Sequence, residues 1–248
     1  MNTQQLLHAL ATVPGTPGQH ITRRMAVNMI AAGRAEAAGA LVELIGPEVI
    51  PMLAAARAPV PALRSAIDTA LLEHYREMPA FLAAHGGRPA FASWCRQAAY
   101  TLPAELPEIV DIYRGTMGCS PAAAAIGLHW SLNFDDAAHY ACRFADAAMT
   151  GVVIVHARVP RDGIACIVSG VAHSEVVPAE APTGFEVITD HERIGDAAVR
   201  RHHQLRAMRD TGLWREVQGS AGVGEAVARA ARARMAAAGV APGTAIVA

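Results

Sequence analysis

The spacing of hydrophobic residues along the chain changes near residue 108. Before that point, apolar side chains recur at the three- and four-residue intervals of amphipathic helices, as at Ile67, Leu71 and Leu72. Proline and glycine interrupt this pattern at residues 14–15, 46–47, 59–61 and 86–87. The interruptions predict helices of roughly ten to fifteen residues, whose apolar stripes pack into their own core.

After residue 108 the apolar segments shorten and become rich in valine and isoleucine, as strands do. We expect strands at 109–113, 126–132, 151–159, 163–168, 173–177 and 184–188, with a helix over 135–149. Residues 196–238 return to helical character. The sequence therefore predicts an α+β chain with a helical N-terminal region (1–105), a small β core (106–195) and a C-terminal helical tail (196–248).

Composition excludes several classes of chemistry. The 248 residues are 52% hydrophobic, which is typical of a folded chain with a proper core. All 21 basic residues are arginine, so no lysine can form a Schiff base or bind phosphate in a P-loop. The formal net charge is -1, and no basic block indicates nucleic acid; Arg229, Arg232 and Arg234 fit a solvated helix face.

The four cysteines and the 11 histidines are dispersed, without any C-x-x-C or H-E-x-x-H pattern. Their spacing predicts reduced thiols and no metal site. The N-terminus has no signal-type sequence, and no run of about eighteen apolar residues predicts a membrane span. We expect a bacterial cytoplasmic protein without a membrane partner, a localisation compatible with delivery by a specialised secretion system.

Three polar residues on separate predicted strands indicate a candidate site. Arg114 follows an apolar approach and precedes a glycine, Ser131 lies in the second predicted strand, and Glu175 stands inside an apolar one. Inward-facing positions of neighbouring strands lie side by side, so the three can converge on one cleft. Arginine offers a fork of donors to phosphate, and a carboxylate can stabilise positive charge at an anomeric carbon.

The order of these motifs resembles the ADP-ribosyltransferase-like fold. The resemblance covers about residues 108–190 and includes Tyr113-Arg114-Gly115, His129-Trp130-Ser131, Ala141-x-x-Phe144-Ala145 and Glu175. Within that fold, the sequence is similar to the arginine-serine-glutamate branch, which includes many bacterial toxins, and particularly to phage-associated members. The resemblance implies an enzyme that breaks the nicotinamide glycosidic bond of NAD and transfers ADP-ribose to a macromolecular acceptor, expected to be a protein.

The resemblance also implies residue roles. Arg114, Ser131 and Glu175 would be catalytic, with Glu175 holding the nicotinamide ribose. NAD would be bound by Tyr113, Arg114, Gly115, His129, Trp130, Ser131 and Phe144. Two positions depart from the family pattern: His129 replaces the usual serine before tryptophan, and His173 stands where the branch often places Gln or Glu to select the acceptor.

The alternatives differ in what these residues do. Water as the acceptor would make the protein an NAD glycohydrolase. A catalytically degenerate interaction module of prophage origin would keep the fold without the chemistry, and a third possibility places partner binding in the helical half. Each residue also has an ordinary structural interpretation: Arg114 as a solvated charge, Tyr113, Trp130 and Phe144 as core, and Glu175 as an edge-strand residue facing water.

Overall fold

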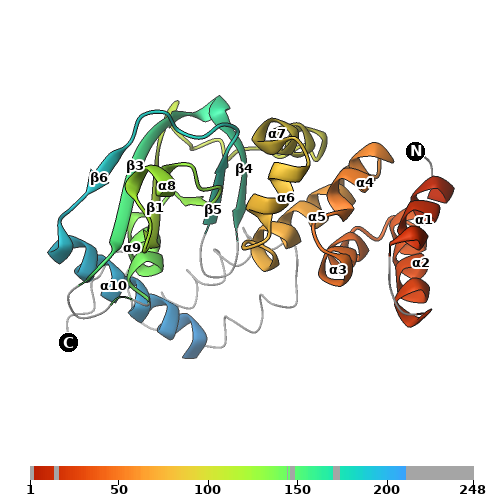
Figure 1. Cartoon of the computed structure of the whole chain (residues 1–248), viewed down its shortest axis with the longest axis horizontal. Coiled ribbons are helices and arrows are strands. Elements are labelled where there is room, and N and C mark those ends of the chain that lie inside the picture. The colour runs from red at the N-terminus through yellow and green to blue at the C-terminus, as the bar shows by residue number, and fades with distance from the viewer. Residues whose placement is uncertain (1–2, 14–16, 144, 146–148, 170–173, 211–248) are drawn as a thin grey trace. The chain divides into compact units, whose positions relative to one another are not determined.

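The computed structural model describes residues 3–13, 17–143, 145, 149–169 and 174–210. It contains helices and one six-stranded sheet (Figure 1), which confirms the predicted α+β class. Contacts divide the described residues into two units. The N-terminal unit comprises residues up to 108 with 160–168 and 177–180, and the C-terminal unit comprises 109–159, 169–176 and the residues from 181 onward. None of the described helices is both long and apolar enough to cross a membrane.

The N-terminal unit is helical through residue 97, as predicted. Its helices are α1 (Thr3–Thr12), α2 (Pro17–Ala31), α3 (Glu36–Ile45), α4 (Val49–Ala55), α5 (Val60–Glu73), α6 (Met78–Ala84) and α7 (Gly87–Gln97). The predicted interruptions are confirmed at three places, because Gly46 follows α3, Pro59 precedes α5 and Gly86 precedes α7. Gly46 has a φ of 100°, a conformation that glycine adopts without strain.

A polar cluster fixes the chain just after α7 to α5. The Tyr100 hydroxyl donates to Asp68, and the Arg64 guanidinium lies 5.1 Å from the Tyr100 ring centroid while its Nη2 donates to the Ala98 carbonyl at 3.0 Å. Burial raises the pKa of the Asp68 carboxyl, although the Tyr100 hydrogen bond and the Arg64 charge partly oppose this. The cluster thus keeps a carboxylate hydrogen-bonded in a place where water solvates it poorly.

We expect Tyr100→Phe to destabilise the protein by about 1–2 kcal/mol near neutral pH, because Asp68 loses a donor. A carboxyl whose folded pKa is raised contributes stability that is complete below its unfolded pKa and is lost as pH rises through the folded pKa. Removing the hydroxyl raises that folded pKa further. The free energy of unfolding that Tyr100→Phe loses should therefore be smaller at about pH 4 than at pH 7, as measured by urea unfolding.

The exposed Tyr75 provides the control for this substitution, because its hydroxyl accepts from Arg76 at the surface. Tyr75→Phe should change the free energy of unfolding by less than about 0.5 kcal/mol at either pH. A Tyr100→Phe loss that is equal at both pH values would contradict the coupling to Asp68.

The strands follow one another in the hydrogen-bonded order β4-β5-β2-β1-β3-β6. Their bounds are β1 (Ile109–Met117), β2 (Trp130–Ser131), β3 (Val152–Pro160), β4 (Ile164–Ser169), β5 (Ser174–Pro178) and β6 (Glu186–Ile188). The short β2 pairs antiparallel with β1 through Tyr113 and Ser131, and with β5 through Ser131 and Glu175. The three strands that carry the predicted polar trio are therefore neighbours.

Two elements around β2 are shorter than their predictions. The strand expected over 126–132 is limited to Trp130–Ser131, because helix α8 (Pro121–Ala125) precedes it and the Trp130 indole donates to the Gly127 carbonyl at 2.9 Å, closing a turn. Helix α9 covers Phe134–Cys142 and not 135–149. It begins where the Asn133 side chain accepts from the Asp135 amide at 2.8 Å, an ordinary N-cap.

Helices α9 and α10 (His191–Asp210) pack together in the C-terminal unit (Figure 1). Their shared core consists of small or aliphatic buried residues, namely Ala137, Ala138, Ala141, Ile154, Ile194, Ala197 and Ala198. Helix α10 begins before the predicted residue 196, and the predicted helix beyond 210, with Arg229, Arg232 and Arg234, lies outside the described residues. Helix α9 approaches β1 closely at Gly115, where an added Cβ would lie 1.7 Å from the Ala137 carbonyl oxygen.

We expect Gly115→Ala to destabilise the fold by more than about 2 kcal/mol, because the obstacle is backbone and cannot rotate away. Chemical denaturation would measure the loss. Gly195→Ala is the matched control: it adds the same methyl group to α10, meets no atom within 4 Å and should be neutral or stabilising by up to about 1 kcal/mol. Equal effects of the two substitutions would contradict the close packing.

Candidate functional site

Arg114 on β1 extends over the chain that leads into β2. Its Nη1 donates to the His129 carbonyl, and its guanidinium occupies the space beside Gly127. A Cβ at residue 127 would lie 2.1 Å from the Arg114 Nε, so the glycine makes room for the arginine. Burial lowers the pKa of Arg114, while the nearby Cys119 and Glu175 partly oppose this change.

His129 connects the arginine to the glutamate. Its Nδ1 lies 2.5 Å from Glu175 Oε2, and the two side chains are 16% and 13% exposed. The pair joins the residue preceding β2 to the second residue of β5, and it lies within the C-terminal unit. The structure therefore brings Arg114, His129 and Glu175 into one cluster, which we call the Arg-His-Glu cluster.

Two nitrogen atoms of this cluster are buried without a hydrogen-bond partner among the described residues. They are the Nε of Arg114 and the Nε2 of His129. A buried polar atom without a partner costs about 1–3 kcal/mol, so such atoms concentrate where a ligand completes the hydrogen bonding. The cluster has the donors that an anionic or hydroxylated ligand would need.

Ser131 has a different set of contacts. Its hydroxyl accepts from the Asn133 amide at 3.0 Å and lies 3.4 Å from Asp136 Oδ2, with Ser131 and Asp136 both buried. These contacts place the hydroxyl at the start of α9. The neighbouring Trp130 is also buried and donates its indole N–H to the Gly127 carbonyl.

The residues on either side of Arg114 pack against α9. Tyr113 meets Phe134 edge-on at 5.7 Å between ring centroids and stacks on His156 at 4.9 Å, while Gly115 lies under the Ala137 carbonyl. Successive side chains of a strand point to opposite faces, so Arg114 points away from α9. Ser131 is the register partner of both Tyr113 and Glu175, so these three residues share one face of the sheet. Arg114 reaches the His129–Glu175 pair through the His129 carbonyl. Phe144 and His173 lie outside the described residues.

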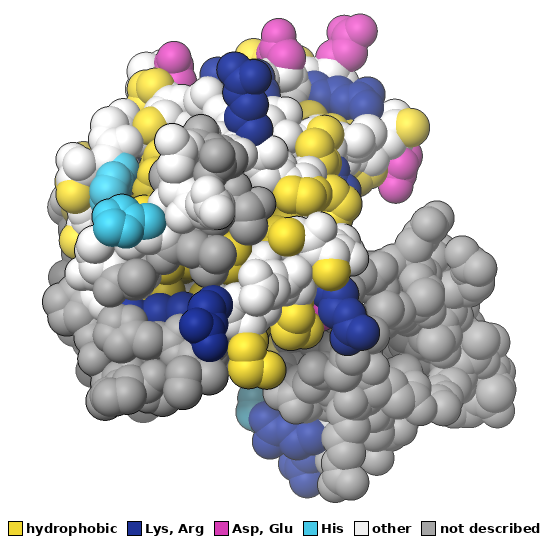
Figure 2. Space-filling view, turned by 90° about the vertical axis from the view of Figure 1, so that its right-hand side faces the viewer, with side chains coloured by type: hydrophobic (Ala, Val, Ile, Leu, Met, Phe, Trp, Pro, Cys, Tyr) yellow, Lys and Arg dark blue, Asp and Glu magenta, His cyan; other side chains and the backbone are white. Residues whose placement is uncertain are grey.

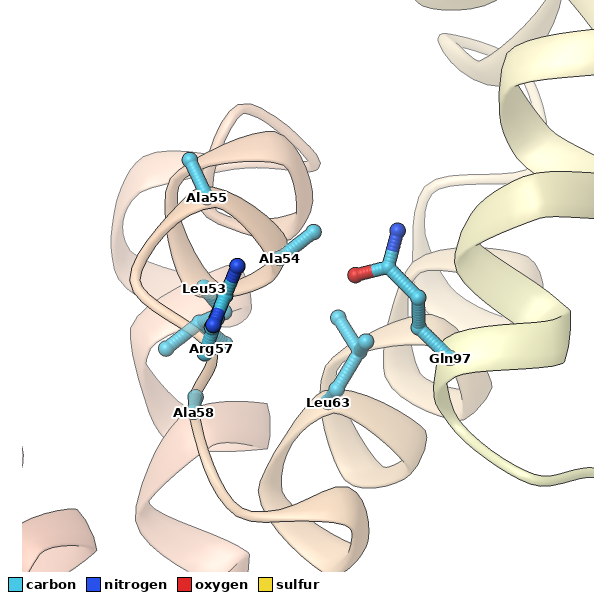
Figure 3. A pocket seen from close by; sticks show the side chains of 7 residues that line it. All are labelled: Leu53, Ala54, Ala55, Arg57, Ala58, Leu63 and Gln97. Atoms are coloured by element: carbon cyan, nitrogen blue, oxygen red, sulfur yellow. The ribbon is translucent and has the colours of Figure 1, made fainter. Parts of the chain in front are cut away.

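Two cavities are lined by other residues. One, of about 560 Å³, is bordered by α4, α5 and α7 (Figure 3), and the second, of about 270 Å³, lies at the start of α10 between Asp190, Arg193 and Arg200. Among the described residues, no group of three or more His, Cys, Asp or Glu side chains could hold a metal ion. The Arg-His-Glu cluster is defined by its contacts.

Gly127 is the feature of this site that the sequence analysis missed. A glycine inside an expected strand indicates a bulge or a close approach of another group, and here the approaching group is the Arg114 guanidinium. The pairing of His129 with Glu175 had no such local signal, because the two residues are 46 positions apart.

Comparison with known proteins leaves the family open, because no protein-family model, curated protein or solved structure matches the chain. The similarity of its motifs to the ADP-ribosyltransferase-like fold stays a prediction. The function must therefore be argued from the contacts and chemistry of the Arg-His-Glu cluster.

We expect His129 and Glu175 to be energetically coupled. In a double-mutant cycle of His129→Gln and Glu175→Gln, the coupling free energy from urea unfolding should be about 1–3 kcal/mol, because the pair is largely desolvated. His156 and Asp111, 2.7 Å apart with Asp111 54% exposed, form a matched pair in the same unit. Their cycle should give less than about 1 kcal/mol, and a coupling as large as that of His129 and Glu175 would contradict the expectation.

Proposed function

We propose that the C-terminal unit is an NAD-consuming enzyme, a mono-ADP-ribosyltransferase that cleaves the nicotinamide glycosidic bond. The observation that supports this most directly is the convergence of Arg114 and Glu175 on His129, with the Arg114 Nε and His129 Nε2 buried and without a hydrogen-bond partner among the residues that the structure describes. A fork of cationic donors beside a carboxylate suits a substrate that carries both phosphate and ribose.

The proposed reaction uses charge and position and requires no metal ion. The bond between the nicotinamide nitrogen and the ribose anomeric carbon breaks, and its electron pair leaves with nicotinamide. The Glu175 carboxylate holds the ribose and stabilises the oxocarbenium-like transition state, while Arg114 binds a phosphate or ribose oxygen. A nucleophilic atom of the acceptor then bonds to the anomeric carbon and loses its proton.

His129 has a positioning role in this proposal. Its ring holds one carboxylate oxygen of Glu175 at 2.5 Å and its carbonyl accepts from Arg114, so one residue fixes the two charged groups relative to each other. The carbonyl that accepts from Arg114 is present in any residue at position 129, whereas the contact with Glu175 uses the imidazole ring. We infer that the histidine takes over here the role of the usual serine of the resembled branch.

The second candidate is a catalytically degenerate module that binds a partner. The observation in its favour is that the Ser131 hydroxyl is engaged with Asn133 and Asp136 at the start of α9, so the expected strand hydroxyl is directed to the fold. Under this alternative, the Arg-His-Glu cluster would be a structural network of the sheet.

Release of free nicotinamide from NAD by the purified full chain, with bacterial lysate as a source of acceptors, tests the first candidate. Glu175→Gln should lower the rate by about 100-fold or more, because the variant loses the charge that stabilises the transition state. Because glutamine keeps the shape of the glutamate side chain, the variant should still bind NAD. NAD should therefore still raise the melting temperature of the variant, as binding linkage requires.

Glu180→Gln is the matched control. Glu180 is exposed, and its substitution removes the same charge outside the Arg-His-Glu cluster. Its nicotinamide release should equal that of the wild type. Undiminished release by Glu175→Gln would exclude the proposed role of Glu175. Absence of both release and an NAD-dependent thermal shift in the wild type would instead favour the degenerate module.

A further inference from the structure

A second cluster of ionisable side chains lies where helices α9 and α10 pack together. The rings of His139 on α9 and His202 on α10 are 6.1 Å apart between centroids and tilted by 33°. Arg201 precedes His202 on α10, and the Arg143 amide donates to the His139 carbonyl at 3.0 Å, one helical turn further along the chain. We call these four residues the His139 cluster. All four belong to the C-terminal unit.

The surroundings of His139 favour the neutral imidazole. Burial lowers the pKa of His139 most, and its positive neighbours lower this pKa further, namely His202, Arg201 and Arg143. Of the charges that act on His139 within the described residues, that of Asp136 alone raises the pKa, and Asp136 already forms an ion pair with Arg201. A proton on His139 is therefore a positive charge among positive neighbours in a half-buried contact.

This positive environment is local to the two helices. The formal net charge of the chain is -1. On the face shown in Figure 2, arginine side chains lie at several separate places, with acidic side chains among some of them. A positive potential of the whole molecule therefore does not account for the effect on His139. The effect comes from the few side chains that α9 and α10 bring together.

The apolar packing beside the His139 cluster uses small side chains. Five of the seven buried residues in the core that α9 and α10 share are alanines. An alanine buries little apolar area, so each contributes less to the packing than a leucine or phenylalanine would. A single added charge is therefore large relative to the interactions that hold these helices together.

We propose that the contact between α9 and α10 is a pH-sensitive switch, in which protonation of His139 weakens the packing of α10 on α9. Near neutral pH the imidazole is neutral and the two helices pack together. A histidine whose folded pKa is lowered supports the packed state fully above its ordinary pKa of about 6.5, and this contribution is lost as pH falls through the folded pKa. The switch does not rest on the NAD-dependent function.

Arg201 has two opposite effects on this switch. It pairs with the buried Asp136, whose Oδ2 lies 3.4 Å from the Ser131 hydroxyl oxygen, and this ion pair holds α10 on α9. Release of α10 would leave the Asp136 carboxylate without that guanidinium, which opposes opening at neutral pH. The same guanidinium repels a proton on His139 and favours opening when the imidazole is charged.

The experiment is amide hydrogen exchange of the full chain at about pH 7.5 and about pH 5.5, an interval in which histidines titrate and ordinary carboxyls stay ionised. Rates are corrected for the intrinsic effect of pH on exchange. The opening equilibrium of the α10 amides should rise at least about three-fold at the lower pH. His139→Gln cannot take up a proton, so it should reduce this rise to less than about 1.5-fold.

His203→Gln is the matched control, because His203 is exposed on the same helix and is not among the described charges that act on His139. It should keep the wild-type response to pH. An NMR titration of the wild type, with the His139 ring signal assigned by its absence in His139→Gln, should give a pKa below about 6.5. Arg143→Gln should raise this pKa and reduce the response of α10, because it removes one positive neighbour.

Four outcomes would overturn the proposal. They are a pKa of His139 at or above about 6.5, equal opening of α10 at both pH values, an undiminished response in His139→Gln, and loss of the response in His203→Gln. The NMR titration and the Arg143→Gln variant test the switch even if His139→Gln fails to fold.

Discussion

The C-terminal unit depends on the close approach of α9 to β1 at Gly115. There the Ala137 carbonyl occupies the space in which any other residue would carry its Cβ. The approach allows a layer of alanines to fill the gap between helix and sheet, and it brings the start of α9 to the Ser131 hydroxyl. One glycine thus sets the distance that the packing of α9, and through it α10, requires.

Much of the fold could be predicted because its signals are local. The change from helical spacing to valine- and isoleucine-rich segments near residue 108 correctly indicated an α+β chain, and Gly46, Pro59 and Gly86 correctly marked helix boundaries. The lengths of the helices and strands were harder to predict from the sequence. The turn closed by Trp130 and Gly127 shortens the strand expected there, and that contact depends on tertiary packing.

The candidate site could be predicted only in part. Neighbouring strands carry Arg114, Ser131 and Glu175, as the sequence suggested, but the direction of each side chain depends on its surroundings. Ser131 precedes a helix with two acidic residues in its first turn, a pattern that also suits a hydroxyl bonded to the helix start. The link through His129 joins residues far apart in sequence, so only the folded chain reveals it.

The first turn of α9 is neutralised by consecutive arginines of α10. Asp135 accepts from Arg200 at 2.9 Å, and the buried Asp136 forms an ion pair with Arg201. A chain that ended before Arg201 would remove the guanidinium from a carboxylate already shielded from water. Within the described part of α10, the requirement for this helix thus extends past Ala198, its last residue in the apolar core shared with α9, to the arginine that neutralises Asp136.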